Sequence, residues 1–300
     1  MPEWREEALI LSARPHGENA AIVTVLTAGQ GRHAGLVPGG AGSRLRGTLQ
    51  PGNLVGAEWR ARLPEQLGQM KVEIMQSVPA MILDDSLRLA GVASACALLD
   101  GTLPERDAQP ALFAATQALF NLICIDDPDH RWVEGYIRWE LGLLQAVGFS
   151  LDLERCAVTG TETRLAHVSP KSGRAVAEGA AGDFAGRMLV LPRFLGGVSC
   201  NRHDFEAGLS LTGHFFERRV FAAHHADIPP QRRRFFDMVS GLFLRGSYRH
   251  SWHLSGILIF VVFIPLHFHI DQTPYRKTCA FVAEYPHGAR QRPAFQKNGL

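Results

Sequence analysis

The first 80 residues contain five short apolar runs, each separated from the next by a turn-forming cluster. The runs alternate or are rich in β-branched residues, which is typical of half-buried strands. Glycine, proline and asparagine supply the breaks because they favour tight turns. Five strands in so short a stretch predict a small closed barrel of the OB type, although an SH3-like barrel fits nearly as well. The runs are EALILSARP, NAAIVTVLTA, GRHAGLVPG, NLVGAEWRAR and MKVEIMQSV.

Beyond this region the apolar residues recur at the helical period. DDSLRLAGVASACALLDG predicts a helix with Asp84 or Asp85 as its N-cap and Gly101 as its stop. QPALFAATQALFNLICI predicts a second helix with Pro110 near its first turn. Third and fourth helices are expected in DHRWVEGYIRWELGLLQAVGF and RHDFEAGLSLTGHFFERRVF, the fourth capped by Asp204.

The change of period predicts an α+β multidomain protein. An OB-type barrel is expected in residues 1–80, and an all-α domain in residues 81–240 with an insertion at residues 155–184. Residues 241–300 read as an atypical C-terminal extension that holds an apolar run of 17, LSGILIFVVFIPLHFHI. We expect a lineage-specific or accidental extension, for instance from an altered reading frame, without an assigned function. A membrane span is the alternative, at the lower limit of length.

Charge is segregated along the chain although the net charge is only +2. Residues 81–154 carry 4 basic and 12 acidic side chains, whereas residues 155–250 carry 14 basic and 8 acidic. Such segregation fits one anion-binding surface and one acidic helical module. The five cysteines are far apart and form no CxxC pair, and the N-terminus lacks the apolar segment of a secretory signal. Both features predict a cytoplasmic protein with reduced thiols.

The sequence contains no motif of a known catalytic or cofactor site. A phosphate-binding loop, a zinc-protease HExxH, a GxSxG elbow and a dinucleotide fingerprint are all missing from it. The acidic cluster at residues 126–129 lacks the spacing of a calcium loop and is interpreted as an interhelical turn that caps the third helix. We therefore predict neither an enzyme nor a cofactor.

The arginines of the barrel region suggest a different kind of site. Three of them surround the glycine-rich segment GRHAGLVPGGAGSRLRG, and two lie on one face of the strand that contains EWRAR. Arginines that follow a groove on a small barrel suit a phosphate backbone, but a solvated strand face would have the same composition. The candidates are Arg32, Arg44, Arg46, Arg60 and Arg62.

From about Trp4 to about Phe236 the chain resembles the RecO family of recombination mediators. The resemblance is carried by EALILSARPHGENAAIVTVLTAGQGRHAGLV, SRLRGTLQPGNLV, YIRWELGLLQAVGFSLDLERCAVTG, VSPKSGRAV and LTGHFFERRVF in this order. It implies an N-terminal OB fold and a helical C-terminal domain without enzymatic turnover. It also implies binding of single- and double-stranded DNA, strand annealing, and work with RecR to load RecA on DNA coated by single-strand-binding protein (SSB). The five barrel arginines then become the expected DNA contacts.

The resemblance also implies a site for the acidic, apolar-ended tail of SSB in the helical domain. Such a tail requires a hydrophobic pocket with cations at its rim. Arg131, Trp132 and Arg138, near the third helix, are the candidates. The chain departs from the family pattern after GL, where VPGGAGS replaces more basic residues. DNA affinity could therefore be weaker here or shared with residues 155–250.

Many members of the family carry a four-cysteine zinc ribbon where this chain has residues 155–184. The ligand positions fall here at Cys156, Thr159, Ala177 and Ala180, so one thiol remains. One thiolate cannot complete a tetrahedral structural site. We therefore predict a zinc-ribbon-like insertion without metal. Ordinary packing by Val158, Leu165, Val168 and Val176, together with hydrogen bonds of Thr159 and Ser169, would hold its turns.

Overall fold

The computed structural model describes residues 2–198 and 204–244, which belong to one compact unit spanning residues 1–250. The apolar run at residues 254–270, and with it the membrane-span alternative, lies outside the described residues. Within the described ranges, no helix combines the length and apolarity needed to cross a membrane.

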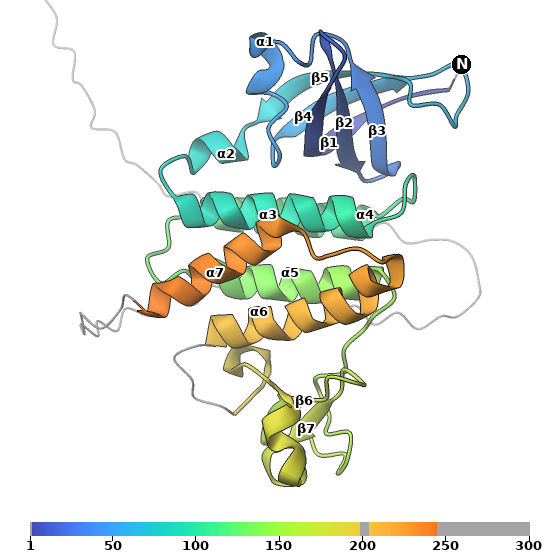
Figure 1. Cartoon of the computed structure of the whole chain (residues 1–300). Coiled ribbons are helices and arrows are strands. Elements are labelled where there is room, and N and C mark those ends of the chain that lie inside the picture. The colour runs from blue at the N-terminus through green and yellow to red at the C-terminus, as the bar shows by residue number, and fades with distance from the viewer. Residues whose placement is uncertain (1, 199–203, 245–300) are drawn as a thin grey trace, which may run out of the picture. The chain divides into compact units, whose positions relative to one another are not determined.

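The N-terminal part is a closed barrel of five strands in the order β1-β2-β3-β5-β4 (Figure 1). β1 closes the barrel because it pairs with both β2 and β4. All pairs are antiparallel except β3 with β5, which meet in parallel at Leu36 and Gln69. The five predicted strands are confirmed. They are β1 (Glu3–His16), β2 (Ala20–Thr27), β3 (Gly31–Val37), β4 (Leu54–Arg60) and β5 (Gln69–Gln76).

Strand alternation divides the apolar side chains of the barrel between two cores. One set, including Ile10, Val23 and Met70, points into the barrel. Leu9 and Leu11 belong instead to the cluster that contains the helices, and β1 packs on α3. The barrel and the helical module thus share apolar surface. The Cys96 thiol of α3 also donates to the Ile10 carbonyl at 3.6 Å.

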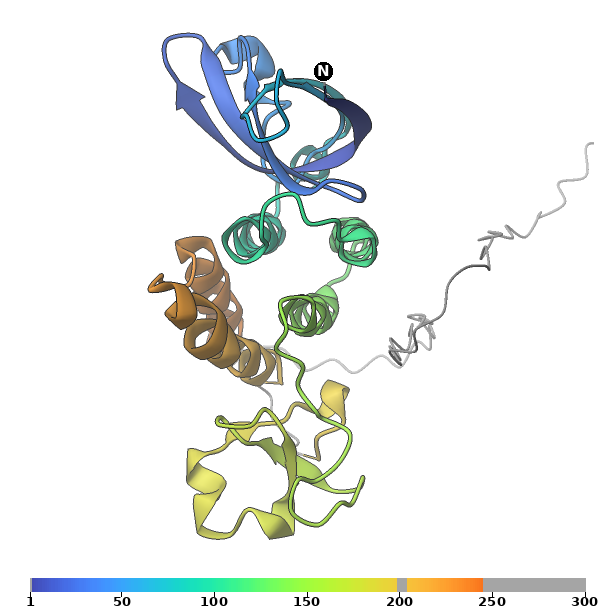
Figure 2. The same cartoon turned by 90° about the vertical axis from the view of Figure 1, so that its right-hand side faces the viewer.

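Helices follow the barrel, as predicted, and Figure 2 shows several of them nearly end-on. Asp85 caps α3 by accepting from the backbone N–H groups of Leu87 and Arg88. α3 continues through Gly101 to Thr102, so Gly101 does not end the helix as predicted. Asp127 accepts from the backbone N–H of Trp132, which confirms the acidic turn as a cap of the third helix. The helices are α2 (Val78–Met81), α3 (Ser86–Thr102), α4 (Pro110–Cys124), α5 (Trp132–Ala146), α6 (Asp204–Phe215) and α7 (Pro230–Leu244).

The C-terminal helices differ from the sequence expectation in two ways. α6 begins at Asp204 but ends at Phe215, where a π-helical turn (Phe216–Phe221) takes over. Helix α7 was not predicted, because its first turns carry three consecutive arginines and few apolar residues. α7 packs along α3 and against α6.

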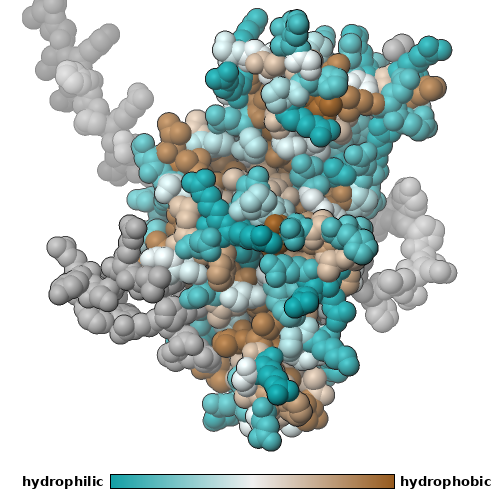
Figure 3. All heavy atoms as spheres, viewed as in Figure 1, coloured by the Kyte–Doolittle hydropathy of each residue, from teal (hydrophilic) through white to brown (hydrophobic). Residues whose placement is uncertain are grey.

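The insertion between α5 and α6 forms a small sheet in the order β7-β6-β8, with strands β6 (Leu165–Val168), β7 (Ala175–Ala177) and β8 (Leu189–Val190). The sheet thus extends beyond residue 184, the expected end of the insertion. Leu165, Val168 and Val176 are buried, as predicted, but Val158 is 68% exposed and does not pack. On the face shown in Figure 3, hydrophilic side chains predominate and hydrophobic patches are small.

Candidate nucleic-acid interface

Arg44 and Arg46 lie on a short helix, α1 (Ser43–Arg46), within the connection between β3 and β4. Both side chains are exposed and have no carboxylate partner among the described residues. Leu45, between them, packs on the barrel core, so the two arginines face outward. Asn53 anchors the following turn, since its amide donates to the Gly47 carbonyl at 2.7 Å. The glycine-rich segment thus presents both cations from a fixed base.

Arg60 is the last residue of β4 and pairs with Glu3 at the start of β1, and Arg62 follows two residues later. In Figure 1 the start of β1, beside the N-terminus, lies on the opposite side of the barrel from α1. Arg60 and Arg62 are both exposed and flank the buried Ala61, as the two-residue period of a strand predicts. β4 spans seven residues, so its two ends are about 20 Å apart. The arginines therefore form two groups, at opposite ends of the barrel, and not one cluster.

Arg32 faces the helical module instead of open solvent. Its Nε donates to the Leu103 carbonyl at 2.8 Å, and its Nη atoms lie 3.2 Å from Asp100 and 3.5 Å from Glu105. Only 19% of its side chain is exposed. Arg106, from the same α3–α4 connection, donates back to the Gln66 carbonyl at 3.0 Å. Arg32 thus joins the barrel to the helices, and its predicted DNA contact stays a prediction.

An aromatic cluster lies at the end of the barrel that carries Arg60. The register of β1 and β4 places Trp4 opposite Trp59, and their rings are nearly parallel with centroids 6.2 Å apart. His33 meets both rings edge-on, at 5.2 Å from Trp4 and 4.7 Å from Trp59. Neither ring nitrogen of His33 has a hydrogen-bond partner in the part of the chain described. Burial and, second, the positive charge of Arg106 lower the pKa of His33 to about 4.

A groove of about 500 Å³ lies beside this cluster. The two-residue period of the strands makes Glu3, Arg5, Glu58, Arg60 and Lys71 project from the outer face of the sheet, whereas Trp59 and Met70 are 4% and 0% exposed and belong to the barrel core, on which Trp4 packs. Trp4 was missed, because only the β1–β4 register shows that it lies against Trp59. The full lining is Glu3, Trp4, Arg5, Pro38, Glu58, Trp59, Arg60, Gln69, Met70 and Lys71.

Two family models match the chain. Recombination protein O N terminal matches residues 1–78 and Recombination protein O C terminal matches residues 83–227, which together cover the barrel and most of the helical module. Relatives named DNA repair protein RecO occur in Rhodospirillum centenum, Paracoccus denitrificans and Rhodospirillum rubrum, at 50%, 48% and 46% identity. These matches span 85%, 77% and 79% of this chain and 98%, 94% and 96% of the respective relatives.

The chain belongs to the RecO family of DNA repair proteins. The resemblance found in the sequence is confirmed over both parts of the protein. DNA repair and recombination are therefore its functional class. Neither the family descriptions nor the names of the relatives designate an enzyme.

The three residues predicted for the SSB tail occupy different environments in this RecO-family fold. Trp132 is 1% exposed and stacks on Phe235 of α7 at 5.7 Å, so its ring is core and not a pocket wall. Arg131 is exposed at the start of α5, 3.7 Å from Asp129. Arg138, two turns on, donates to the Phe194 carbonyl at 2.8 Å and lies over the ring of the same residue.

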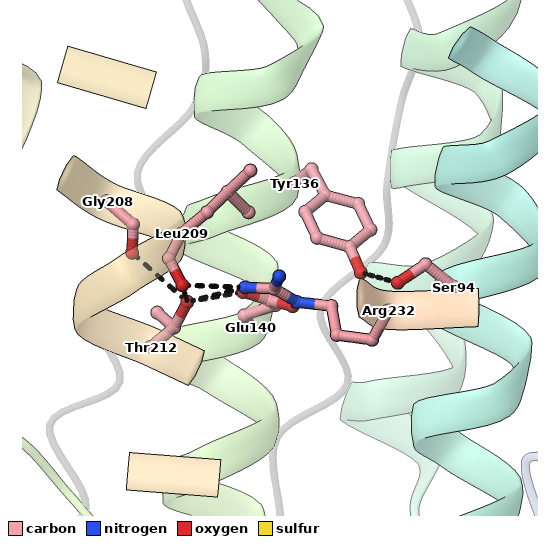
Figure 4. A network of polar contacts seen from close by, with 7 residues as sticks. All are labelled: Ser94, Tyr136, Glu140, Gly208, Leu209, Thr212 and Arg232. Atoms are coloured by element: carbon pink, nitrogen blue, oxygen red, sulfur yellow. Dashed lines mark hydrogen bonds and ion pairs between the residues drawn. The ribbon is translucent and has the colours of Figure 1, made fainter. Parts of the chain in front are cut away.

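The helical module contains a buried polar network that the sequence analysis did not predict (Figure 4). Glu140 of α5 and Arg232 of α7 are 0% and 2% exposed and bond through both carboxylate oxygens, at 2.5 Å and 3.0 Å. The Thr212 hydroxyl donates to Glu140 at 2.5 Å, and Arg232 also donates to the Leu209 carbonyl at 2.8 Å. Burial alone would lower the pKa of Arg232, but the carboxylate of Glu140 raises it above the usual value of an arginine. The network joins α5, α6 and α7.

In the insertion, the one remaining thiol, that of Cys156, accepts hydrogen bonds from backbone N–H groups. The buried Cys156 sulfur accepts from the backbone N–H of Thr159 at 3.4 Å and of Ala177 at 3.2 Å, which are two of the four positions that the sequence analysis predicted as counterparts of zinc ligands. Burial alone would raise the pKa of the thiol, but hydrogen bonds from Thr159, Ala177 and Val158 lower it to about 7. Among residues 2–198 and 204–244, no three His, Cys, Asp or Glu side chains converge as metal ligands would.

Proposed function

We propose that the chain is a non-enzymatic mediator of DNA repair and recombination that acts in the cytoplasm. It binds single- and double-stranded DNA, anneals complementary strands, and works with RecR to load RecA on SSB-coated DNA. The observation that carries the DNA-binding step is the pair of exposed arginines on α1, Arg44 and Arg46, which have no carboxylate partner in the part of the chain described. Arg60 and Arg62 form a second, separate group of exposed cations at the other end of the barrel.

Annealing follows from charge neutralisation. Two strands repel one another through their phosphates until bases pair, and arginines that contact both backbones lower this repulsion. Each contacted phosphate releases condensed counterions, so binding and annealing both weaken as salt rises. Guanidinium groups suit this role because they stay charged and bind phosphate oxygens in pairs.

The proposed domains are an OB-type barrel at residues 1–80, a helical domain at residues 81–240 with a metal-free zinc-ribbon-like insertion, and an extension at residues 241–300. The closed barrel, whose first strand pairs with both β2 and β4, supports the OB type. The sulfur of Cys156 accepts hydrogen bonds from the backbone N–H groups of Thr159 and Ala177, so it connects the two segments of the insertion in which the other ligand positions fall. This contact supports the relation of the insertion to a zinc ribbon.

The SSB tail is the proposed partner of the helical domain. Its carboxylates would meet the exposed Arg131, just before α5, and Arg138 within α5, where they would compete with Glu134, which lies 3.3 Å from Arg138. Trp132 packs on Phe235 in the core and would not contact the tail itself. Binding the tail next to a DNA-binding barrel would bring the mediator to SSB-coated strands, where RecR and RecA act.

A strand-annealing assay with complementary oligonucleotides, at several salt concentrations, tests the proposal. The wild type should accelerate annealing, and Arg44→Glu with Arg46→Glu should weaken single-strand binding and flatten its salt slope by about one to two counterions. The matched control, Arg44→Lys with Arg46→Lys, keeps the charge and should keep the slope. A wild type that does not accelerate annealing would contradict the mediator function and favour a protein-interaction module with weak DNA contact.

A further inference from the structure

We propose that two turns of the helical module together form a docking surface for a basic amphipathic segment of a partner protein. The first turn, residues 81–85, lies before α3, and the second, residues 125–129, lies after α4. We call them the paired turns. The inference goes beyond the proposed DNA binding, because the surface is acidic and its partner carries the opposite charge to DNA.

Arg88 of α3 holds the paired turns together. Its Nε lies 3.1 Å from the carboxylate of Asp85 in the first turn, and its Nη2 lies 3.3 Å from that of Asp126 in the second. The arginine side chain is only 11% exposed, and Asp85 also caps α3 through the backbone N–H groups of Leu87 and Arg88. A surface fixed in this way loses little conformational freedom when a partner binds, which favours binding.

The paired turns expose large apolar side chains. Leu83 is 71% exposed, Met81 is 60% exposed, and Ile125 in the second turn is 55% exposed. Figure 3 shows hydrophobic side chains beside α2, at the left of the molecule. A single exposed leucine is ordinary on a protein surface, but three large apolar side chains on two linked turns form a patch of the kind that marks an interaction site.

Carboxylates surround this apolar patch. Residues 81–88 and 125–131 contain five aspartates and two arginines, a formal charge of −3 with histidine neutral. Asp84 is exposed and has no cationic partner among the residues that the structure describes. Asp126 is exposed as well, and it shares Arg88 with Asp85. The paired turns thus combine an apolar centre with an acidic rim that the protein itself only partly neutralises.

Charge complementarity decides which partner fits. DNA and an acidic peptide such as the SSB tail are both anionic, so the rim repels them. Lysine and arginine side chains are attracted to the rim, and apolar side chains on one face of a helix can cover Leu83 and Ile125 at the centre. A basic amphipathic helix supplies both. Because this surface and the exposed arginines of the barrel attract opposite charges, the protein can hold such a partner and DNA without competition for the same groups.

The experiment measures binding of two labelled peptides to the full chain by fluorescence anisotropy. The first is an amphipathic helix of about 18 residues with leucine on one face and lysine on the other, and the second carries glutamate in place of every lysine. The wild type should bind the lysine peptide, less tightly as salt rises, and not the glutamate peptide. Leu83→Ser should weaken this binding about tenfold through lost apolar burial, and Asp84→Lys about 2- to 5-fold through lost attraction.

Val158→Ser is the matched control, because Val158 is 68% exposed but lies in the insertion, and it should bind as the wild type does. The proposal is overturned if the wild type binds neither peptide, if it binds both equally, or if Leu83→Ser and Asp84→Lys bind like the control. If a variant does not fold, the comparison of the two peptides on the wild type still decides. A dimer of the wild type in sedimentation equilibrium that Leu83→Ser abolishes would assign the surface to a second copy and also overturn the proposal.

Discussion

The barrel and the helical module differ in whether their buried ionisable side chains have hydrogen-bond partners. In the helical module Glu140 and Arg232 are buried together and satisfy one another through two hydrogen bonds, with Thr212 completing the set. In the barrel, His33 is 3% exposed and contacts the rings of Trp4 and Trp59, and neither of its ring nitrogens has a hydrogen-bond partner in the part of the chain described.

The difference separates an internal role from a surface one. The helical module uses its buried charges to fix how three helices meet, so those charges are unavailable to a ligand. The barrel keeps its buried histidine neutral and leaves cations such as Arg44 exposed. Charge on the barrel is therefore available to DNA, whereas charge inside the helices stabilises the fold. Three predictions test this contrast.

Glu140→Ala should have the largest effect. It leaves the Arg232 guanidinium buried without a counter-charge, which should lower the free energy of unfolding by about 3–5 kcal/mol. Denaturant-induced unfolding followed by circular dichroism measures the change. The control is Glu140→Leu combined with Arg232→Met, which removes both charges and should restore most of the stability. If the midpoint of denaturant-induced unfolding of Glu140→Ala equals that of the wild type, the pair does not hold the helices together.

His33 should make barrel stability depend on pH. Its folded pKa of about 4 lies below the unfolded value of about 6.5, so the unfolded chain binds more protons between these values. The stability that neutral His33 contributes is complete above pH 6.5 and is lost as pH falls through 4, on the order of 3 kcal/mol in all.

Unfolding curves of the wild type and of His33→Phe between pH 7 and pH 4 check this dependence. The variant cannot gain a proton at this position. As the pH falls, the free energy of unfolding of the wild type should therefore decrease relative to that of His33→Phe. Carboxylates elsewhere titrate in both proteins and cancel in the comparison. A constant difference across the range would mean that His33 is not held neutral in the barrel.

Local patterns predicted the elements that depend on neighbours in sequence. The five strands, the Asp85 cap and the Asp127 cap follow from periodicity and from residues within a few positions. Gly101 shows the limit of such signals, because α3 continues through it. Short elements such as α1 gave no signal at all, since four residues are too few for a helical period.

The parts that were missed depend on contacts between residues far apart in the chain. Glu140 and Arg232 are 92 residues apart, and the run PQRRRFFDMV reads as a solvated basic segment until α7 is seen to pack on α3. One hint was available: Glu140 lies on the same helical face as Tyr136, within the apolar stripe of α5. Trp4 and Trp59 likewise meet only through the register of β1 and β4.

Arg32 lies between the two regions and gives the smallest of the three effects. Arg32→Ala removes charge-assisted bonds to Leu103, Asp100 and Glu105, and should lower the free energy of unfolding by about 1.5–3 kcal/mol. The salt slope of single-strand binding should stay near that of the wild type, whereas Arg44→Ala should reduce it by about one with little change in stability. Unfolding and salt titration of both variants make the comparison. An unchanged stability together with a reduced slope would return Arg32 to the set of DNA contacts and extend the binding surface to the edge of the helical module.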